Sequence, residues 1–198
     1  MNIAIAGGSG FLGTALARTL AAEGHDVAIL TRQSSIKAPA QPHISFVPWT
    51  PDGNAGPWAR SVDGATAVVN LAGESIAAKR WSAAQKQKLR DSRLLATRSL
   101  TTAIRQAGRP PAAFLSGSAV GYYGDRGEET ITEASPPGTD FLAGLAKEWE
   151  AAAIDVANDE RAIGLSQVGF ELVGSGTAAD FALRCHAVAS GETLNKRV

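Results

Sequence analysis

A chain of 198 residues is long enough to form one domain with a sizeable hydrophobic core. Lysine plus arginine and aspartate plus glutamate each total 19, and the resulting net charge of zero argues against nucleic acid or an anionic membrane as a partner. The single cysteine, Cys185, excludes an internal disulfide, and because no Cys/His spacing typical of a metal site is present either, we expect a protein of the reducing cytoplasm.

The stretch from Asn2 to Gly13 predicts a strand, a glycine-rich turn and the start of a helix. Its apolar run is not preceded by the basic region of a signal peptide, and no apolar run approaches the roughly 18 residues that a membrane span needs. Gly7, Gly10 and Gly13 follow the spacing Gly-x-x-Gly-x-x-Gly between strand and helix, which is the context of a dinucleotide-binding turn.

Each glycine of this turn has a physical role. Gly7 permits the tight turn, Gly10 lets a pyrophosphate approach the backbone, and Gly13 lets the helix pack closely on the sheet. Free N–H groups and the positive end of the helix dipole then face the phosphates. The alternative is a glycine-rich turn between a strand and a helix that holds no ligand.

The second predicted strand, Val27–Leu30, ends in Thr31 and Arg32. A site that prefers NAD usually has an acidic residue here, which binds the ribose 2′-hydroxyl, whereas an arginine can bind the extra 2′-phosphate of NADP. The sequence therefore predicts NADP(H) as cofactor. The alternative is that Arg32 is a solvated surface charge.

Strands and helices alternate along the rest of the chain. Gly24 is expected to end the first helix, and Ser82 to cap a long one. Further strands are predicted at 44–47, 65–70, 112–116 and 162–170, and further helices at 82–107, from Thr139 or Asp140 to about 156, and at 177–189. Trp49 and Trp58 flank a stretch rich in proline and glycine, and we expect them to anchor that loop.

This order predicts an α/β fold, a doubly wound parallel sheet of about six strands with helices on both faces. Ligands of such sheets lie outside the carboxyl ends of the strands. Four segments are therefore expected to converge on one crevice: 7–13, 31–32, 70–76 and 116–124. The last of these begins a long loop, 117–138, and a loop of that length in a compact domain is usually functional.

Several motifs together resemble one family. The segment Gly7–Gly13 resembles the nucleotide loop of extended and atypical short-chain dehydrogenases/reductases. The more specific resemblance, to the epimerase-like branch of the NAD-dependent epimerase/dehydratase proteins, is carried by Asn70-Leu71-Ala72-Gly73-Glu74-Ser75-Ile76, Arg80-Trp81, Asp91-Ser92-Arg93, Ser118-Ala119-Val120-Gly121-Tyr122-Tyr123-Gly124-Asp125-Arg126-Gly127, Asp140-Phe141-Leu142-Ala143 and Trp149-Glu150.

The resemblance covers about residues 1–176. It implies a Rossmann fold and a cytoplasmic NADP-binding protein with oxidoreductase or epimerase chemistry on a carbonyl, hydroxyl or sugar-nucleotide substrate that the resemblance does not identify. It also implies the cofactor-binding residues, which are Gly7, Ser9, Gly10, Phe11, Leu12, Gly13, Thr31, Arg32, Leu71, Ala72, Gly73 and Glu74.

The catalytic candidates also come from the resemblance. In the wider superfamily a serine binds the substrate oxygen, and a tyrosine four residues before a lysine shuttles the proton. Ser118 matches the serine and Lys147 the lysine, but Ala143 occupies the tyrosine's position and cannot deliver a proton. Tyr122 and Tyr123 are the only tyrosines, and Tyr122 is the favoured replacement.

Structural alternatives stay open for each candidate. Ser118 can be a hydroxyl that stabilises a turn, Lys147 a surface lysine, and the two tyrosines can pack the loop against the cofactor. Arg93 occupies the position of a proton-relay asparagine in related enzymes. No metal site is predicted, since the three histidines are isolated from one another in the chain.

Family members continue past the sixth strand, whereas this chain stops at Val198. We therefore expect 1–198 to form a single NADP-binding domain in which 171–198 is an incomplete remnant of the substrate-binding part. Two functions follow: an NADP(H)-dependent enzyme, or a non-catalytic dinucleotide-binding module, such as a redox sensor, an interaction protein or a truncated inactive form. The long helix from Ser82 can pair with a twofold mate, as in relatives, to form a homodimer.

Overall fold

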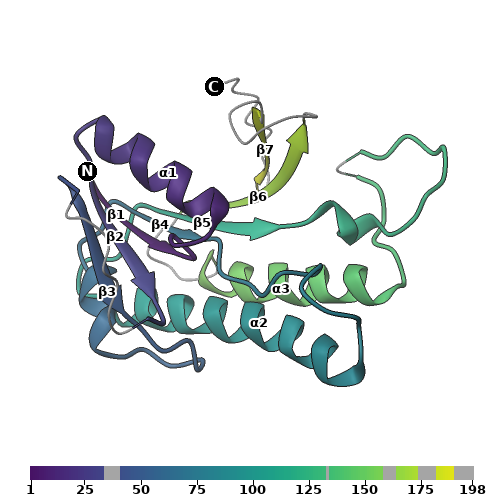
Figure 1. Cartoon of the computed structure of the whole chain (residues 1–198), viewed down its shortest axis with the longest axis horizontal. Helices are drawn as coiled ribbons and strands as arrows, with labels where there is room; N and C mark the ends of the chain where they lie inside the picture. The colour runs from purple at the N-terminus through teal and green to yellow at the C-terminus, as the bar shows by residue number, and fades with distance from the viewer. Residues whose placement is uncertain (34–40, 133, 158–163, 174–181, 190–198) are drawn as a thin grey trace.

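The computed structural model describes residues 1–33, 41–132, 134–157, 164–173 and 182–189 (Figure 1). Within these residues the chain forms one sheet and three longer helices. The strands are β1 (Asn2–Ala6), β2 (Asp26–Thr31), β3 (Ile44–Pro48), β4 (Ala67–Asn70), β5 (Ala113–Ser118), β6 (Gly164–Val173) and β7 (Ala182–Ala189). The helices are α1 (Phe11–Ala22), α2 (Ala83–Gln106) and α3 (Phe141–Ala157), with short 3₁₀ turns η1 (Pro57–Ser61) and η2 (Val120–Tyr123).

The sheet has the order β3-β2-β1-β4-β5-β6-β7. Strands β1 to β6 pair in parallel, which confirms the predicted parallel sheet, and β7 adds an antiparallel edge to β6. The helix predicted at 177–189 is wrong for 182–189, which is β7, while 177–181 lie outside the described residues. In the sequence of β7, Leu183 and Cys185 alternate with Arg184 and His186, and this period of two is typical of a strand.

Helices cover both faces of the sheet, as predicted (Figure 1). Successive strand residues point to opposite faces, so each strand contributes to two cores. On one face Ile5 and Ile29 pack in a cluster with Ala17 of α1. On the other, Phe114 packs in a cluster with Leu100 of α2, and α3 lies beside α2 on the same face. Because β1 to β6 run in parallel, their carboxyl ends meet at one edge.

The predicted helix boundaries are confirmed at three places. Gly24 follows α1 with φ of +80°, a conformation that favours glycine. The Ser82 side chain accepts a hydrogen bond from the Gln85 N–H at 3.2 Å, and Asp140 accepts one from the Ala143 N–H at 2.9 Å, so Asp140 rather than Thr139 caps α3. No helix in the part of the chain that the structure describes has the length and apolar character needed to cross a membrane.

The loop between β3 and β4 is anchored by Trp49 and Trp58, as predicted. Both are buried, at 7% and 3% exposure, and their rings meet edge to face with centroids 5.3 Å apart. The Trp49 N–H donates to the carbonyl oxygen of Thr31 at 2.9 Å. The loop is therefore held beside the carboxyl end of β2.

Candidate functional site

The turn after β1 is a backbone cradle in which added side chains would collide. Gly7 has φ of +78°, and a Cβ there would lie 2.6 Å from the backbone of Leu71. The sequence predicts that Gly13 lets the helix pack closely on the sheet. In the structure a Cβ on Gly13 would lie 2.3 Å from the Gly7 carbonyl oxygen, so Gly13 packs against the turn instead. Exposed Gly10 is the N-cap of α1 and has no side chain to cap it, which leaves N–H groups of the first helical turn open to an anion.

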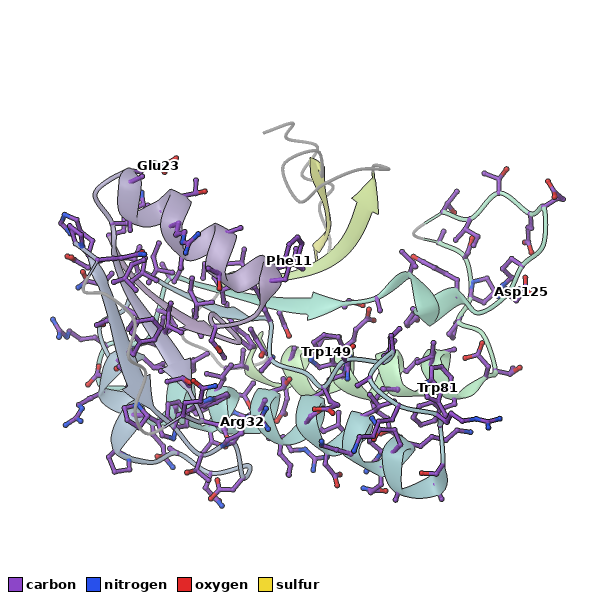
Figure 2. The ribbon with its side chains drawn as sticks, in the orientation of Figure 1. Phe11, Glu23, Arg32, Trp81, Asp125 and Trp149 are labelled. Carbon is purple, nitrogen blue, oxygen red and sulfur yellow. The ribbon has the colours of Figure 1, made fainter. Side chains whose placement is uncertain are left out.

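A cleft of about 240 Å³ opens beside this turn at the carboxyl edge of the sheet. Three of the four segments predicted to converge meet in it. The predicted cofactor residues that line it are Gly7, Ser9, Gly10, Thr31, Arg32, Leu71, Ala72 and Gly73. Four other predicted cofactor residues, Phe11, Leu12, Gly13 and Glu74, lie outside this lining, and Phe11 projects from the start of α1 with 61% exposure (Figure 2).

The two residues at the end of β2 differ in exposure. Thr31 is buried, and its hydroxyl oxygen accepts a hydrogen bond from the Gln33 N–H at 3.1 Å. Arg32 is exposed (Figure 2). The hydrogen bond from Lys88 does most to lower the pKa of Glu74, and the positive charge of Arg32 adds to this effect, so Arg32 and Glu74 lie within electrostatic reach of each other.

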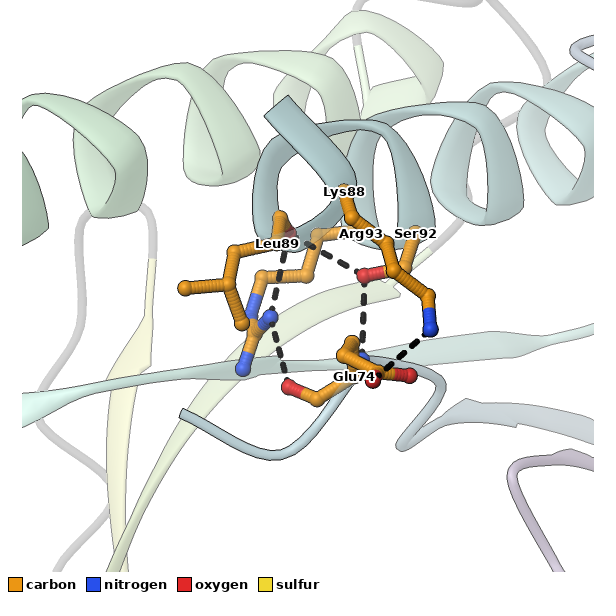
Figure 3. A network of polar contacts seen from close by, with 5 residues as sticks. All are labelled: Glu74, Lys88, Leu89, Ser92 and Arg93. Atoms are coloured by element: carbon orange, nitrogen blue, oxygen red, sulfur yellow. Dashed lines mark hydrogen bonds and ion pairs between the residues drawn. The ribbon is translucent and has the colours of Figure 1, made fainter. Parts of the chain in front are cut away.

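Hydrogen bonds fix the segment after β4 onto α2 (Figure 3). The Glu74 N–H donates to Ser92 Oγ at 3.0 Å, and Lys88 Nζ donates to Glu74 Oε1 at 3.0 Å. Arg93 Nη1 donates to the carbonyl oxygens of Glu74 and Leu89, both at 3.1 Å. One wall of the cleft is therefore held in place by side chains of a helix.

Arg93 supplies a partly buried positive charge behind this wall. Its guanidinium lies 5.3 Å from the centre of the Trp149 ring, and a Cβ on Gly73 would lie 3.1 Å from its Cζ. Burial lowers the pKa of Arg93, and the negative charge of Glu74 counteracts this. Arg93 thus joins the segment after β4, α2 and α3 through packing as well as charge.

A buried polar network lies beneath the cleft. Asn70, which is fully buried at the end of β4, donates through Nδ2 to Thr97 Oγ1 at 2.9 Å and to Ser116 Oγ at 3.3 Å. Its Oδ1 accepts from the Ala72 N–H at 3.2 Å, and Trp149 Nε1 donates to Thr97 Oγ1 at 3.0 Å. Asn70 therefore connects the cleft wall to α2, β5 and α3.

Ser118, the predicted catalytic serine, is the last residue of β5 and is half-buried. Its hydroxyl donates a short hydrogen bond to Oε1 of Glu150 on α3. Burial raises the pKa of the Glu150 carboxyl, and the hydrogen bond from Ser118 offsets part of that rise. A carboxyl group that ionises less readily than usual therefore touches the hydroxyl predicted to bind substrate.

The other catalytic candidates lie on α3 and in η2. Lys147 is exposed on α3 and forms no hydrogen bond or ion pair with any residue that the structure describes. Ala143, at the position of the family's tyrosine, is fully buried. Tyr122 and Tyr123 lie in η2, where their rings pack edge to face with centroids 5.2 Å apart.

The loop after η2 extends from the molecule, with Asp125 near its start (Figure 2). Arg126 donates to the carbonyl oxygens of Tyr123 at 3.1 Å and of Pro136 at 2.6 Å. It therefore ties the two ends of the loop together. The predicted long loop is thus held near its base by a side chain of its own.

Sequence reasoning did not single out several residues of this site. From the sequence, Glu150 was named only as part of the motif Trp149-Glu150. Glu150 lies seven residues after Ala143 and three after Lys147, and this helical spacing, which places all three on one helix face, could have identified it. Five further residues were also not placed in the cleft from the sequence, which are Leu30, Trp49, Pro51, Ser92 and Ala96. Among the described residues, no three His, Cys, Asp or Glu side chains gather as metal ligands would.

Comparison with known proteins agrees with this geometry. The family model for the NAD dependent epimerase/dehydratase family matches residues 3–166. Epimerase family protein Mb2239 of Mycobacterium bovis is 40% identical over 176 residues, which are 88% of this chain and 55% of that protein. The chain spans about half the length of the curated relatives it matches.

Two solved structures share the fold. Human epimerase family protein SDR39U1 (isoform 2), solved with NADPH, has 31% identity and a TM-score of 0.72, covering 89% of this chain and 56% of that one. A nucleoside-diphosphate sugar epimerase from Corynebacterium glutamicum has 33% identity and a TM-score of 0.66, covering 84% of this chain and 33% of that one. With the family model matched over most of its length, the chain belongs to the NAD dependent epimerase/dehydratase family.

Proposed function

We propose that this chain binds NADP(H) in the cleft and acts as an oxidoreductase or epimerase on a carbonyl, hydroxyl or sugar-nucleotide substrate. The observation that carries the proposal is the side-chain-free glycine cradle, which opens on a cleft lined by the exposed Arg32. The human relative solved with NADPH and the C. glutamicum sugar epimerase support the cofactor and the substrate class.

In this proposal the chain's own groups divide the work. The turn from Gly7 to Gly13 holds the pyrophosphate, Arg32 binds the 2′-phosphate, and the Leu71–Glu74 wall lies along the dinucleotide. When bound, the nicotinamide ring accepts or supplies the hydride. Ser118 hydrogen-bonds the substrate oxygen, and Lys147 binds the nicotinamide ribose.

A second candidate is a dinucleotide-binding module without catalysis. The specific observation that favours it is Ala143, which is fully buried where the family's proton-transferring tyrosine would stand. Tight NADPH binding with no turnover of either UDP-glucose or 4-nitrobenzaldehyde would select this candidate.

Arg32→Asp is expected to weaken NADPH binding about 10- to 100-fold, since a charge-assisted hydrogen bond contributes about 1.5–3 kcal/mol. NADH binding should be unchanged, because NADH lacks the 2′-phosphate. Calorimetric titration of both nucleotides measures the two affinities. The matched control is Arg60→Asp, the same charge change in a separate hollow, lined by Asn2 and Asp26, at the opposite edge of the sheet.

Equal affinities of the unaltered protein for NADPH and NADH would remove the proposed role of Arg32. Binding of neither nucleotide would overturn the dinucleotide function altogether. An equal loss of NADPH affinity in Arg60→Asp would show a general charge effect and not a contact with the phosphate.

We also propose a cytoplasmic homodimer formed through α2 and α3. The outer surfaces of these helices form a hollow with an apolar part, which includes Ile154 at 42% exposure, and a charged part. Its lining residues are Leu94, Ala151, Ala152 and Ile154 together with Arg90, Arg98, Glu148 and Asp155. Sedimentation of the chain as a monomer at micromolar concentration would contradict the dimer. The single cysteine supports a reducing compartment, which cell fractionation tests.

A further inference from the structure

The hydroxyl of Ser118 has a carboxyl partner whose place in the fold suits proton transfer. Ser118 ends β5 at the carboxyl edge of the sheet, where the substrate oxygen is proposed to bind. Glu150 approaches it from α3, on the helix face that carries Ala143 seven residues earlier. The Glu150 carboxyl therefore contacts Ser118 from α3, the helix in which Ala143 occupies the position of the family's tyrosine.

Several charged and titratable groups face α3 from the elements packed against it. Facing α3 from α2 are Arg90, which pairs with Glu148 at 2.6 Å, Arg105, which pairs with Asp155 at 2.8 Å, and Arg93. Arg93 donates to two carbonyl oxygens, and η2 presents Tyr122 and Tyr123. Strand β5 presents no titratable side chain. The Glu150 carboxyl itself accepts the hydrogen bond of the Ser118 hydroxyl.

The protonation state of Glu150 sets the direction of the Ser118 hydroxyl. When Glu150 is ionised, Ser118 donates its proton to the carboxylate and can offer only lone pairs to a substrate. When Glu150 is protonated, it can donate to Ser118 Oγ, and the serine proton is then free to bond a substrate oxygen. Burial raises the Glu150 pKa from its ordinary value, which brings this switch closer to neutral pH, where general acids work best.

We propose that Glu150 exchanges a proton with the substrate through Ser118 and so takes over the task of the missing tyrosine. This inference rests on the proposed NADP(H)-dependent function. In reduction, a hydride from the nicotinamide reaches the carbonyl carbon and the C=O π bond breaks. The oxygen takes the Ser118 proton, Ser118 takes the Glu150 proton, and the carboxylate regains a proton from solvent. Oxidation of an alcohol runs the same transfers in reverse.

The cofactor-free chain provides the first test. With ¹³C-carboxyl-labelled glutamate, the NMR titration of Glu150 should give a pKa above its ordinary value. In Ser118→Ala the pKa should rise further, because the hydrogen bond that stabilises the carboxylate is lost. An ordinary pKa, or one that Ser118→Ala leaves unchanged, would overturn the pairing on which the inference depends.

Turnover provides the second test, with the full chain and two probes: 4-nitrobenzaldehyde with NADPH for reduction, and UDP-glucose with NADP⁺ for oxidation. Glu150→Gln should lower kcat about 100-fold or more, which is the scale of general acid catalysis, while NADPH affinity stays unchanged. In the unaltered chain the reduction rate should fall as the pH rises through the Glu150 pKa, because Glu150 loses its proton. In Glu150→Gln this pH dependence should disappear. Glu150→Asp should restore part of kcat and the pH dependence. The control Glu148→Gln, an exposed carboxyl two residues away, should keep both.

The outcomes separate the two proposals. NADPH binding with no turnover of either probe by the unaltered chain contradicts the enzymatic function and the role of Glu150 with it. Turnover that Glu150→Gln leaves intact contradicts the role of Glu150 alone. If Tyr122→Phe produces that loss of kcat instead, the proton comes from the loop.

Discussion

Gly13→Ala is expected to lower NADPH affinity about 100-fold or more, since displaced phosphate contacts worth about 3 kcal/mol would be lost. The added Cβ would lie 2.3 Å from the Gly7 carbonyl oxygen and 2.5 Å from Gly8 Cα, and both of these atoms are backbone. The turn must therefore move, and its N–H groups lose their aim at the pyrophosphate. Calorimetric titration with NADPH measures the effect, and circular dichroism checks that the variant is folded.

Gly144→Ala is the matched control. Gly144 lies in α3, and a Cβ there would meet nothing within 4 Å. Alanine should leave NADPH binding unchanged and stabilise the chain by up to about 1 kcal/mol, the difference in helix propensity. A folded Gly13→Ala protein that binds NADPH as tightly as Gly144→Ala would contradict the proposed place of the pyrophosphate.

Asn70→Leu is expected to reduce the free energy of unfolding by about 3 kcal/mol, because buried polar partners are left unsatisfied. Thr97 and Ser116 lose a donor, and the Ala72 N–H loses its acceptor. The cleft wall after β4 also loses a tie to its strand, so NADPH affinity should fall as well. Urea unfolding, with and without NADPH, measures both effects.

Thr101→Val serves as the comparison, since Thr101 is buried but its hydroxyl donates only to the Arg98 carbonyl oxygen of its own helix. Its cost should be at most about 1 kcal/mol. If Asn70→Leu cost no more than Thr101→Val, the network would not be a structural connection between the four elements.

The sequence predicted those features that depend on local geometry. The glycine spacing predicted the turn after β1, and the cap positions of Ser82 and Gly24 were correct because capping involves neighbours along the chain. The parallel sheet followed from the alternation of strands and helices. The family resemblance is likewise confirmed by the match over residues 3–166.

The features that the sequence did not reveal depend on distant contacts. Glu150 and Ser118 are 32 residues apart, and only the packing of α3 beside β5 brings them together. The Arg126 contacts that tie its loop depend on how the chain folds back at Pro136. The sequence predicts a helix where β7 forms, because small apolar residues suit both structures. Pairing with β6 decides in favour of the strand.

The cleft also bears on how cofactor selectivity can evolve. Its floor contacts are backbone groups of a glycine turn, and its wall is held from behind by Ser92 and Arg93. Arg32, in contrast, is exposed at a strand end. Under the proposed contact of Arg32 with the 2′-phosphate, natural variation at that one position would change which nicotinamide nucleotide is preferred and leave the scaffold intact. Affinity and discrimination would then vary independently among proteins of this fold.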